Sequence, residues 1–430
     1  MLKIKDWYSL RGMKFIRQRG EQLLKGYNLT PDKAMHRIER CIETLARYGC
    51  VPTLFTPGVI VQRYPQFIKH LRDQGAEIAV HGNQHVNLND YPIVNAKDQL
   101  ERAVRTFDSF GIEAHGFRCP YVGCSDELLD SLPEGLFSYS SNRTIRWELP
   151  PEVVSSNGYK YFDILNNIYN PNDASDMVCV PSNYSNLVEI PVCTPDDLQQ
   201  YYGLNAGTAG IIQTWKHILN QTHHRGELFT LIFHTELANV CEQPFIEILN
   251  EARELHPPVW VACLRDISAW WLEKSKFRVD VDPSSNGLHL SFNCSPRATI
   301  LTRGLGHLDS ENIWNGTYYR LPNEEVEVPA EPRPFVGLQD STPERVLSFL
   351  QDQGYILDTG DTASKCGIFL DSSILARMTS QVQLIDYIEA STAPLVRYWR
   401  WPDGAKSALS ITGDLDALSL LDYSFRLVGR

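Results

Sequence analysis

Short apolar runs alternate with helical stretches between residues 30 and 275 of the 430-residue chain. Helices are predicted over residues 31–48, 65–74, 94–110 and 265–274. The apolar runs are VPTLFTPG (51–58), AEIAV (76–80), EAHGF (113–117), LVEIPV (187–192), LFTLIF (228–233) and PVWVACL (258–264). Because parallel strands must be joined by crossover connections, this alternation predicts an α/β fold, built on either an open parallel sheet or a barrel.

The pattern changes after residue 275. Residues 277–335 are rich in Asn, Ser and Pro with alternating apolar positions, which predicts a β-rich appendage, and helices are predicted near 343–353 and 379–389. Further on, LVRYWRW and AKSALSIT flank Trp401–Gly404 (WPDG), where proline and glycine predict a reversal between two strands. The sequence therefore indicates a main α/β domain with a smaller appended domain.

Four polar motifs directly follow apolar runs. They are HGNQH (His81, His85), FRCPY (Arg118 to Tyr121), LIFHTE (His234) and TGDLDA (Asp414, Asp416). The carboxyl ends of parallel strands meet at one edge of a sheet or barrel, so we expect these side chains to lie close together. The shared position favours one functional site over four unrelated surface features.

Two of the motifs carry groups that suit a metal ion. His81 and His85, at i and i+4, share one face of a helical turn and reach one divalent ion, although such a pair taken alone is more often structural. The carboxylates of Asp414 and Asp416 suit one metal ligand and one free base, and the ordinary alternative is a turn with two solvated acids.

The other two motifs offer an arginine and a histidine. The planar guanidinium of Arg118 can hold a carboxylate in a fixed orientation, and a surface arginine beside a turn gives the same pattern. His234 ends the most apolar run in the chain, where it is either a catalytic group or a core histidine bonded to backbone.

Together the motifs resemble those of the polysaccharide deacetylase family, carbohydrate esterase family 4, also called the NodB-homology domain. HGNQH resembles the family's metal-binding histidine motif, FRCPY its arginine motif, LIFHTE its late histidine motif, and TGDLDA its opening aspartate motif. The resemblance covers residues 30–275 together with 395–420. It implies an α/β fold of the deacetylase type, an irregular (β/α) barrel of about seven strands with a smaller β-rich appended region.

The resemblance also implies a set of catalytic roles. A divalent metal ion would be bound by Asp416, His81 and His85, with Zn²⁺ expected and Co²⁺, Ni²⁺ or Mn²⁺ as alternatives. Asp414 would act as the base, held in place by Arg118.

Two further groups would complete the reaction. The backbone N–H of Tyr121 would stabilise the oxyanion, and His234 would protonate the leaving amine. The acid that supports His234 stays open at this stage among Glu189, Asp196 and Asp197.

The order of the motifs departs from the family pattern. The aspartate motif opens the family's domain, whereas Asp414 and Asp416 lie near the end of this sequence. If one chain builds one site, the sequence is a circular permutation, in which the strand that comes first in the family's barrel comes last in this chain. The barrel would then be formed by residues 1–275 plus 394–430, and the appended domain by residues 276–393. The alternative is a swapped oligomer in which the two aspartates complete a neighbouring chain's site.

The activity implied is hydrolysis of an N-acetyl amide bond on an amino sugar, a polysaccharide or a lipid-linked saccharide, with release of acetate. The expected partner is therefore a saccharide substrate. Two alternatives stay open: a hydrolase of a small non-peptide amide or cyclic ureide, and a non-catalytic carbohydrate-binding or assembly protein.

Composition narrows the partners further. With 40 Lys and Arg against 52 Asp and Glu, the net charge of -12 opposes a phosphate-tracking surface, so nucleic acid is not expected. No run approaches the ~20 apolar residues of a membrane span.

The basic residues within 1–26 predict a solvated amphipathic helix or, alternatively, a peripheral membrane contact. The N-terminal segment lacks a secretory apolar centre and the 10 cysteines form no C-x2-C pair, which predicts a cytoplasmic protein with reduced thiols.

Overall fold

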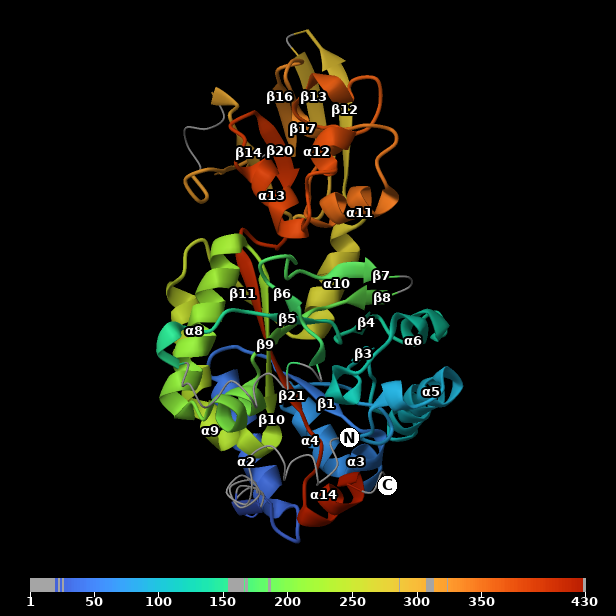
Figure 1. The fold of residues 1–430 in the computed structure, drawn as a ribbon. Coiled ribbons are helices and arrows are strands. Elements are labelled where there is room, and N and C mark those ends of the chain that lie inside the picture. Colours follow the sequence, from blue (N-terminus) through green and yellow to red (C-terminus); the bar gives the residue numbers. More distant parts are fainter. Residues whose placement is uncertain are drawn as a thin grey trace.

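The computed structural model describes residues 20–21, 24, 27–153, 166, 169–184, 187–285, 287–306, 313–322 and 324–427. Figure 1 shows two bodies, a larger one with the main sheet and a smaller one built from residues between 278 and 398. Most of the basic segment 1–26 lies outside the described residues, so its membrane contact stays a prediction. Within the described part of the chain, every helix is too short or too polar to cross a membrane.

A curled sheet of mainly parallel strands forms the larger body. Seven described strands run parallel as successive neighbours in the order β10 (Leu228–His234), β21 (Ser407–Asp414), β1 (Thr53–Thr56), β2 (Glu77–Val80), β3 (Gly116–Phe117), β4 (Tyr139–Ser140) and β8 (Leu187–Glu189). An antiparallel strand, β7 (Ser182–Tyr184), borders β8, and β11 (Val259–Val261) pairs with β21. The predicted α/β fold class is confirmed, and among the described strands the pairing does not close into a full ring.

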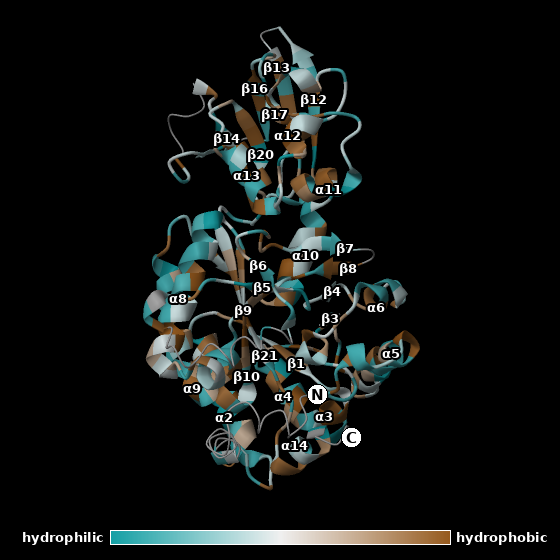
Figure 2. Ribbon diagram, viewed as in Figure 1, coloured by the Kyte–Doolittle hydropathy of each residue, from teal (hydrophilic) through white to brown (hydrophobic). Residues whose placement is uncertain are grey.

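Amphipathic helices cover the outside of this sheet (Figure 1). They are α2 (Asp32–Ala46), α3 (Gly58–Arg63), α4 (Pro65–Asp73), α5 (Ile93–Ser109), α6 (Asp126–Ser131), α8 (Gly207–Arg225), α9 (Ala238–Glu254) and α10 (Leu264–Lys274). Helix α5 shows the pattern, because its buried residues Ala96, Leu100, Ala103 and Phe107 recur on one face. Figure 2 shows hydrophilic and hydrophobic residues side by side along such helices, whereas β1, β2 and β10 are buried throughout, as expected of strands covered on both faces.

Strand β21 lies between two strands that come much earlier in the sequence. It pairs with β10 from Leu228↔Ala408 to His234↔Asp414, and with β1 from Thr53↔Thr412 to Phe55↔Asp414. The residues around 414 are thereby brought beside the ends of the early strands within a single chain.

The appended body consists of three small sheets with short helices. The sheets are β12 (Arg278–Ser284), β13 (Gly287–Asn293) and β16 (Glu325–Val328); β15 (Tyr319–Arg320), β14 (Ile300–Arg303) and β20 (Leu395–Tyr398); and β18 (Leu357–Asp358), β17 (Arg333–Leu338) and β19 (Cys366–Leu370). The helices are α11 (Glu344–Asp352), α12 (Ser372–Leu375) and α13 (Gln381–Glu389). Since β20 pairs with β14, the chain returns to the main sheet after Tyr398 rather than at residue 394.

Candidate active site

The side chains of all four sequence motifs gather at one end of the main sheet. His81 and His85 follow β2, Arg118 follows β3, His234 ends β10, and Asp414 ends β21 with Asp416 just beyond. Their common position follows from the parallel topology, because each motif leaves the carboxyl end of its own strand. The motifs therefore converge as the sequence predicts, although residues 81–85 form an irregular loop and not the predicted helical turn.

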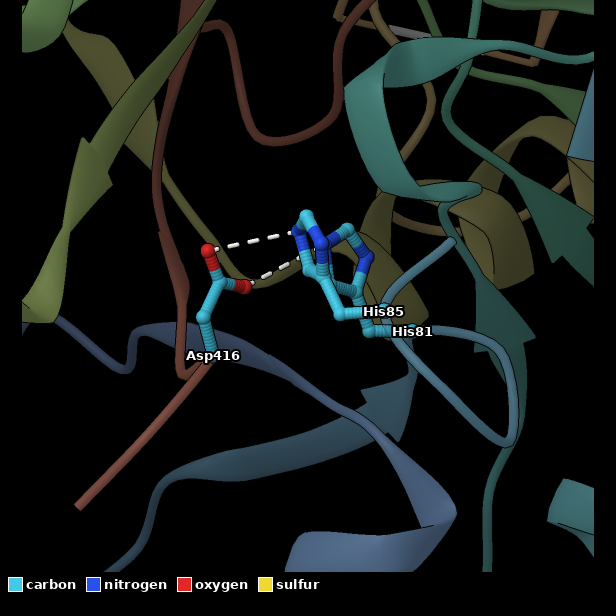
Figure 3. A group of neighbouring side chains, drawn as sticks. All are labelled: His81, His85 and Asp416. Carbon is cyan, nitrogen blue, oxygen red and sulfur yellow. Dashed lines mark ion pairs between the residues drawn. The ribbon is translucent and has the colours of Figure 1, made fainter. Parts of the chain in front are cut away.

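Two histidines and one carboxylate point toward one another (Figure 3). The Nε2 atom of His81 lies 3.4 Å from Oδ1 of Asp416, and Nε2 of His85 lies 3.3 Å from Oδ2 of the same carboxylate. Ligand atoms held about 2.1 Å from a tetrahedral ion are separated by about 3.4 Å, so this spacing suits a small divalent cation. All three side chains are buried.

The hydrogen bonds of His81 prepare its ring for coordination. Its Nδ1 lies 2.9 Å from the carbonyl oxygen of Arg118, so Nδ1 carries the proton and Nε2 presents its lone pair. Among the described residues, this buried Nε2 atom has no hydrogen-bond partner. A buried acceptor without a donor is costly, and a metal ion would satisfy it. The donor set of two imidazoles and one carboxylate therefore fits a divalent metal ion.

Asp414 is held by a buried arginine. The Nη1 group of Arg118 donates to Oδ1 of Asp414 at 3.0 Å and to Oγ1 of Thr412 at 3.0 Å. The other two nitrogens of Arg118 donate to the carbonyl and hydroxyl oxygens of Ser141, both at 3.1 Å. Burial lowers the pKa of the Arg118 guanidinium from its ordinary value, and the Asp414 carboxylate opposes that effect. The second oxygen of Asp414 lies 3.8 Å from Nε2 of His81, next to the candidate metal position.

His234 is paired with Asp197. Its Nδ1 lies 2.7 Å from Oδ1 of Asp197, and its backbone N–H donates to Oδ2 of the same carboxylate at 2.7 Å. Burial lowers the pKa of His234, but the charge and hydrogen bond of Asp197 outweigh burial and raise that pKa to about 10. Since His234 is the strand partner of Asp414, its imidazolium lies at the same level of the sheet as the aspartate motif.

The other two acids considered for His234 have different partners. Glu189 accepts hydrogen bonds from the hydroxyl of Ser140 and from the backbone N–H groups of Asn142 and Arg143. Asp196 accepts from the Tyr169 hydroxyl at 2.7 Å, and burial raises its pKa to about 6. Of the three, Asp197 is the acid bonded to His234.

Tyr121 lies in a strained turn beside the histidines. Its φ of 62° is in the left-handed region, which is uncommon for a residue with a large side chain. Its ring meets the ring of His85 edge to face, with centroids 4.9 Å apart. Within the described residues, its backbone N–H donates to no backbone carbonyl, which leaves that donor for another acceptor.

Sequence reasoning missed one charged residue at the site. Arg426, on helix α14 (Leu420–Leu427), donates from Nε to Nδ1 of His85 at 3.0 Å and lies 2.7 Å through Nη1 from Oδ2 of Asp416. Burial, together with the positive charge of Arg426, holds the pKa of His85 well below its ordinary value. A single arginine on an amphipathic helix carries no sequence signal for this role.

Part of the chain matches a known protein family. Residues 25–134 match the family model described as polysaccharide deacetylase, which confirms the recognition made from the motifs. The matched segment contains His81, His85, Arg118 and Tyr121, whereas His234 and the two aspartates lie outside it. No curated protein matches the sequence.

Several solved structures resemble the chain at low identity. One is described as a putative polysaccharide deacetylase from Mycobacterium smegmatis, with 20% identity, a TM-score of 0.42, and coverage of 54% of this chain and 76% of the other. A family 4 carbohydrate esterase from Streptomyces lividans has 15% identity, a TM-score of 0.30, and coverage of 50% and 80%. An allantoinase has 17% identity, a TM-score of 0.40, and coverage of 55% and 72%.

Proposed function

We propose that the protein hydrolyses the N-acetyl amide bond of an amino sugar in a polysaccharide or a lipid-linked saccharide and releases acetate. This proposal rests on three groups of side chains that lie together at one end of the sheet. A His81, His85 and Asp416 cluster lies beside the Arg118-bound carboxylate of Asp414, and the Asp197-bound imidazole of His234 belongs to the adjacent strand. These are the groups that a metal-assisted amide hydrolase needs.

Asp416, His81 and His85 would hold a divalent metal ion, with Zn²⁺ as the expected ion and Co²⁺, Ni²⁺ or Mn²⁺ as alternatives. Such an ion, when bound, acts as a Lewis acid and lowers the pKa of bound water. Three protein ligands would leave coordination positions open for water and substrate, as a catalytic site requires.

Asp414 would accept the proton of the attacking water. Its Oδ1 is occupied by the guanidinium of Arg118, which fixes the orientation of the carboxylate and leaves Oδ2 as the free base. Arg118 is thus a positioning residue, and its own geometry is fixed by Ser141 and by Thr412.

His234 would donate a proton to the leaving nitrogen. The raised pKa of His234, about 10, keeps its imidazole protonated at neutral pH, as a general acid requires. The backbone N–H of Tyr121 would donate to the developing oxyanion, a contact that contributes about 3 kcal/mol in comparable sites.

We also propose that the chain is a circular permutation of the deacetylase arrangement, with an appended domain that starts near residue 276 and includes β20 up to Tyr398, beyond the predicted boundary at 393. The position of β21 between β1 and β10 supports this proposal, since the strand with the aspartates lies beside early strands of the same chain. A neighbouring chain is not needed to bring Asp416 to the two histidines.

Acetate release from N-acetylglucosamine oligosaccharides tests the proposed function. The wild type should release acetate, and this activity should disappear when the metal is chelated. Asp414→Asn should still bind the metal, but its activity should be lower by about 100-fold or more. Cyclic ureides and small amides are assayed in parallel. Hydrolysis of these alone would favour the small-amide hydrolase, and no hydrolysis of either class by metal-loaded wild type would favour the non-catalytic protein.

A further inference from the structure

Arg426 contacts two of the three candidate metal ligands. Its Nη1 group lies 2.7 Å from Oδ2 of Asp416, and its Nε group donates to Nδ1 of His85 at 3.0 Å. The side chain of Arg426 is 16% exposed, so its charge lies inside the site rather than in solvent. An arginine guanidinium keeps its positive charge in proteins, so Arg426 brings a fixed cation to these two ligands.

The hydrogen bond from Arg426 fixes the proton on the His85 ring. Since the guanidinium has only donors, Nδ1 of His85 must accept, and a neutral His85 then carries its proton on Nε2. That Nε2 atom is the one that faces Asp416, at 3.3 Å. A metal ion bound at Nε2 needs a lone pair there, which moves the ring proton to Nδ1, against the N–H of Arg426. Metal coordination by Nε2 and the bond from Arg426 therefore exclude each other on a neutral ring.

Charge leads to the same conclusion. A divalent ion at Asp416 and the guanidinium of Arg426 would be like charges within the same buried site, where repulsion is weakly screened. The single negative charge of Asp416 cannot fully neutralise both the divalent ion and the guanidinium of Arg426. Arg426 thus behaves as a built-in competitor for the metal position.

We propose that Arg426 gates the metal site: the guanidinium and the divalent ion compete for Asp416 and His85, and the arginine must withdraw for the ion to bind. This inference rests on the proposed metal-dependent function and deepens it by assigning the control of metal binding to a residue on α14. His81, the third ligand, has no bond to Arg426, so the gate acts on two ligands and leaves one ready for the ion.

Withdrawal of Arg426 does not require α14 to unfold. The start of α14 is anchored by Asp422, which accepts from the backbone N–H of Ser419 at 3.0 Å and pairs with Arg63 at 2.7 Å. Arg426 lies one turn further along the helix, beyond this anchor. A change of its side-chain rotamer, or fraying of the last turn, releases both ligands while the anchor holds.

Isothermal titration of full-length, chelator-treated protein with Zn²⁺ tests the gate. Arg426→Met keeps an unbranched side chain without charge, and Arg297→Met is the matched control, because Arg297 pairs with Asp403 near the opposite end of β21. Arg426→Met should bind Zn²⁺ about tenfold more tightly than the wild type, a difference of about 1.4 kcal/mol, and Arg297→Met should match the wild type.

The other outcomes separate the gate from the proposed function. Equal affinity in all three proteins, or weaker binding by Arg426→Met, overturns the gate and leaves a metal-dependent hydrolase standing. Zn²⁺ binding by none of them overturns the metal-dependent function and the gate with it.

A measurement on the wild type covers the case in which Arg426→Met does not fold. The ¹⁵N signal of the Arg426 Nε–H, assigned by comparison with Arg426→Lys, is followed while Zn²⁺ is added. The gate predicts that this N–H loses its protection from solvent exchange as the ion binds. Unchanged protection in the Zn²⁺-loaded protein overturns the proposal.

Discussion

Arg118 and Asp414 form a buried ion pair that joins the end of β3 to the end of β21, with Nη1 and Oδ1 3.0 Å apart. Arg118 is fully buried, and the Asp414 side chain is 10% exposed. The pair connects two segments that lie 296 positions apart in the sequence. It is therefore both part of the site and a link between β21 and the early part of the chain.

Removing one member of this pair should destabilise the fold. In Arg118→Met the Asp414 carboxylate stays buried without its partner, at a cost of about 3–5 kcal/mol in the free energy of unfolding. Urea unfolding in the presence of a chelator measures this cost without a contribution from bound metal. The double variant Arg118→Met with Asp414→Asn should recover much of the loss, because no unpaired charge remains. A double variant no more stable than Arg118→Met would contradict the importance of the ion pair.

The pairing of His234 with Asp197 predicts a pH dependence of activity. The pKa of His234 is raised from 6.5 to about 10, so the imidazolium persists through neutral pH and the acid form is lost only as the pH approaches 10. In Asp197→Asn the carboxylate charge is gone while burial still lowers the pKa of His234. The alkaline limb of kcat/KM should therefore move to lower pH, which a pH–rate profile measures. An unmoved limb would show that His234 is not the proton donor.

The pair of His234 and Asp197 also makes the free energy of unfolding depend on pH, in a direction that can be predicted. A group whose pKa is raised on folding stabilises the protein fully below its unfolded pKa, and that contribution disappears as the pH rises from 6.5 to about 10. The difference in unfolding free energy between wild type and Asp197→Asn should accordingly shrink across this interval. A difference that does not vary with pH would contradict the charged state assigned to the pair.

Much of the site could be predicted because the ends of the strands can be recognised in the sequence. The motifs of His81, Arg118, His234 and Asp414 each follow an apolar run, and parallel topology places such ends together. The sequence does not show which acid would reach His234, since Glu189, Asp196 and Asp197 all lie close to strand ends. Only the tertiary structure separates them, through the 2.7 Å contact of Asp197.

Two features could not be predicted for physical reasons. The turn WPDG predicts that the preceding run LVRYWRW is a strand, but it does not show which sheet that strand joins. Leu395–Tyr398 pairs with β14 in the appended body. Arg426 has the pattern of a solvated helix residue, and its contact with Asp416 depends on how α14 docks. Both depend on contacts between segments distant in sequence, which local patterns do not encode.

Metal binding should stabilise the folded protein through Asp416. A ligand present at 100 times its dissociation constant adds about 2.7 kcal/mol to the free energy of unfolding. Zn²⁺ should therefore raise the melting temperature of the wild type, and Asp416→Ala should lose this shift, as thermal melts monitored by circular dichroism would measure. Asp414→Asn is the matched control, because it changes a neighbouring carboxylate and leaves the ligand set intact. A shift that survives in Asp416→Ala would place the ion elsewhere.

Gly413 allows β21 to fit between its neighbours. A Cβ atom at this position would lie 2.7 Å from the Phe233 ring and 3.0 Å from a methyl group of Leu54. Gly413→Ala should therefore push β21 away from β10 or β1, at a cost of about 1–3 kcal/mol in the free energy of unfolding. Because Asp414 is the next residue, kcat should fall as well, and urea unfolding and acetate release measure the two effects.

The cause of that loss can be separated from a general effect of glycine substitution. Gly360→Ala is the control, since the nearest atom to its added Cβ is 4.0 Å away, and its unfolding free energy should change by less than about 0.5 kcal/mol. Phe233→Leu removes the ring that a Cβ at position 413 would meet, so combining it with Gly413→Ala should cost less than the sum of the two single variants. If the changes in unfolding free energy of the two single variants simply add, the added Cβ is crowded by Leu54 and not by Phe233. Recovery of kcat in the double variant would show that activity depends on the position of Asp414.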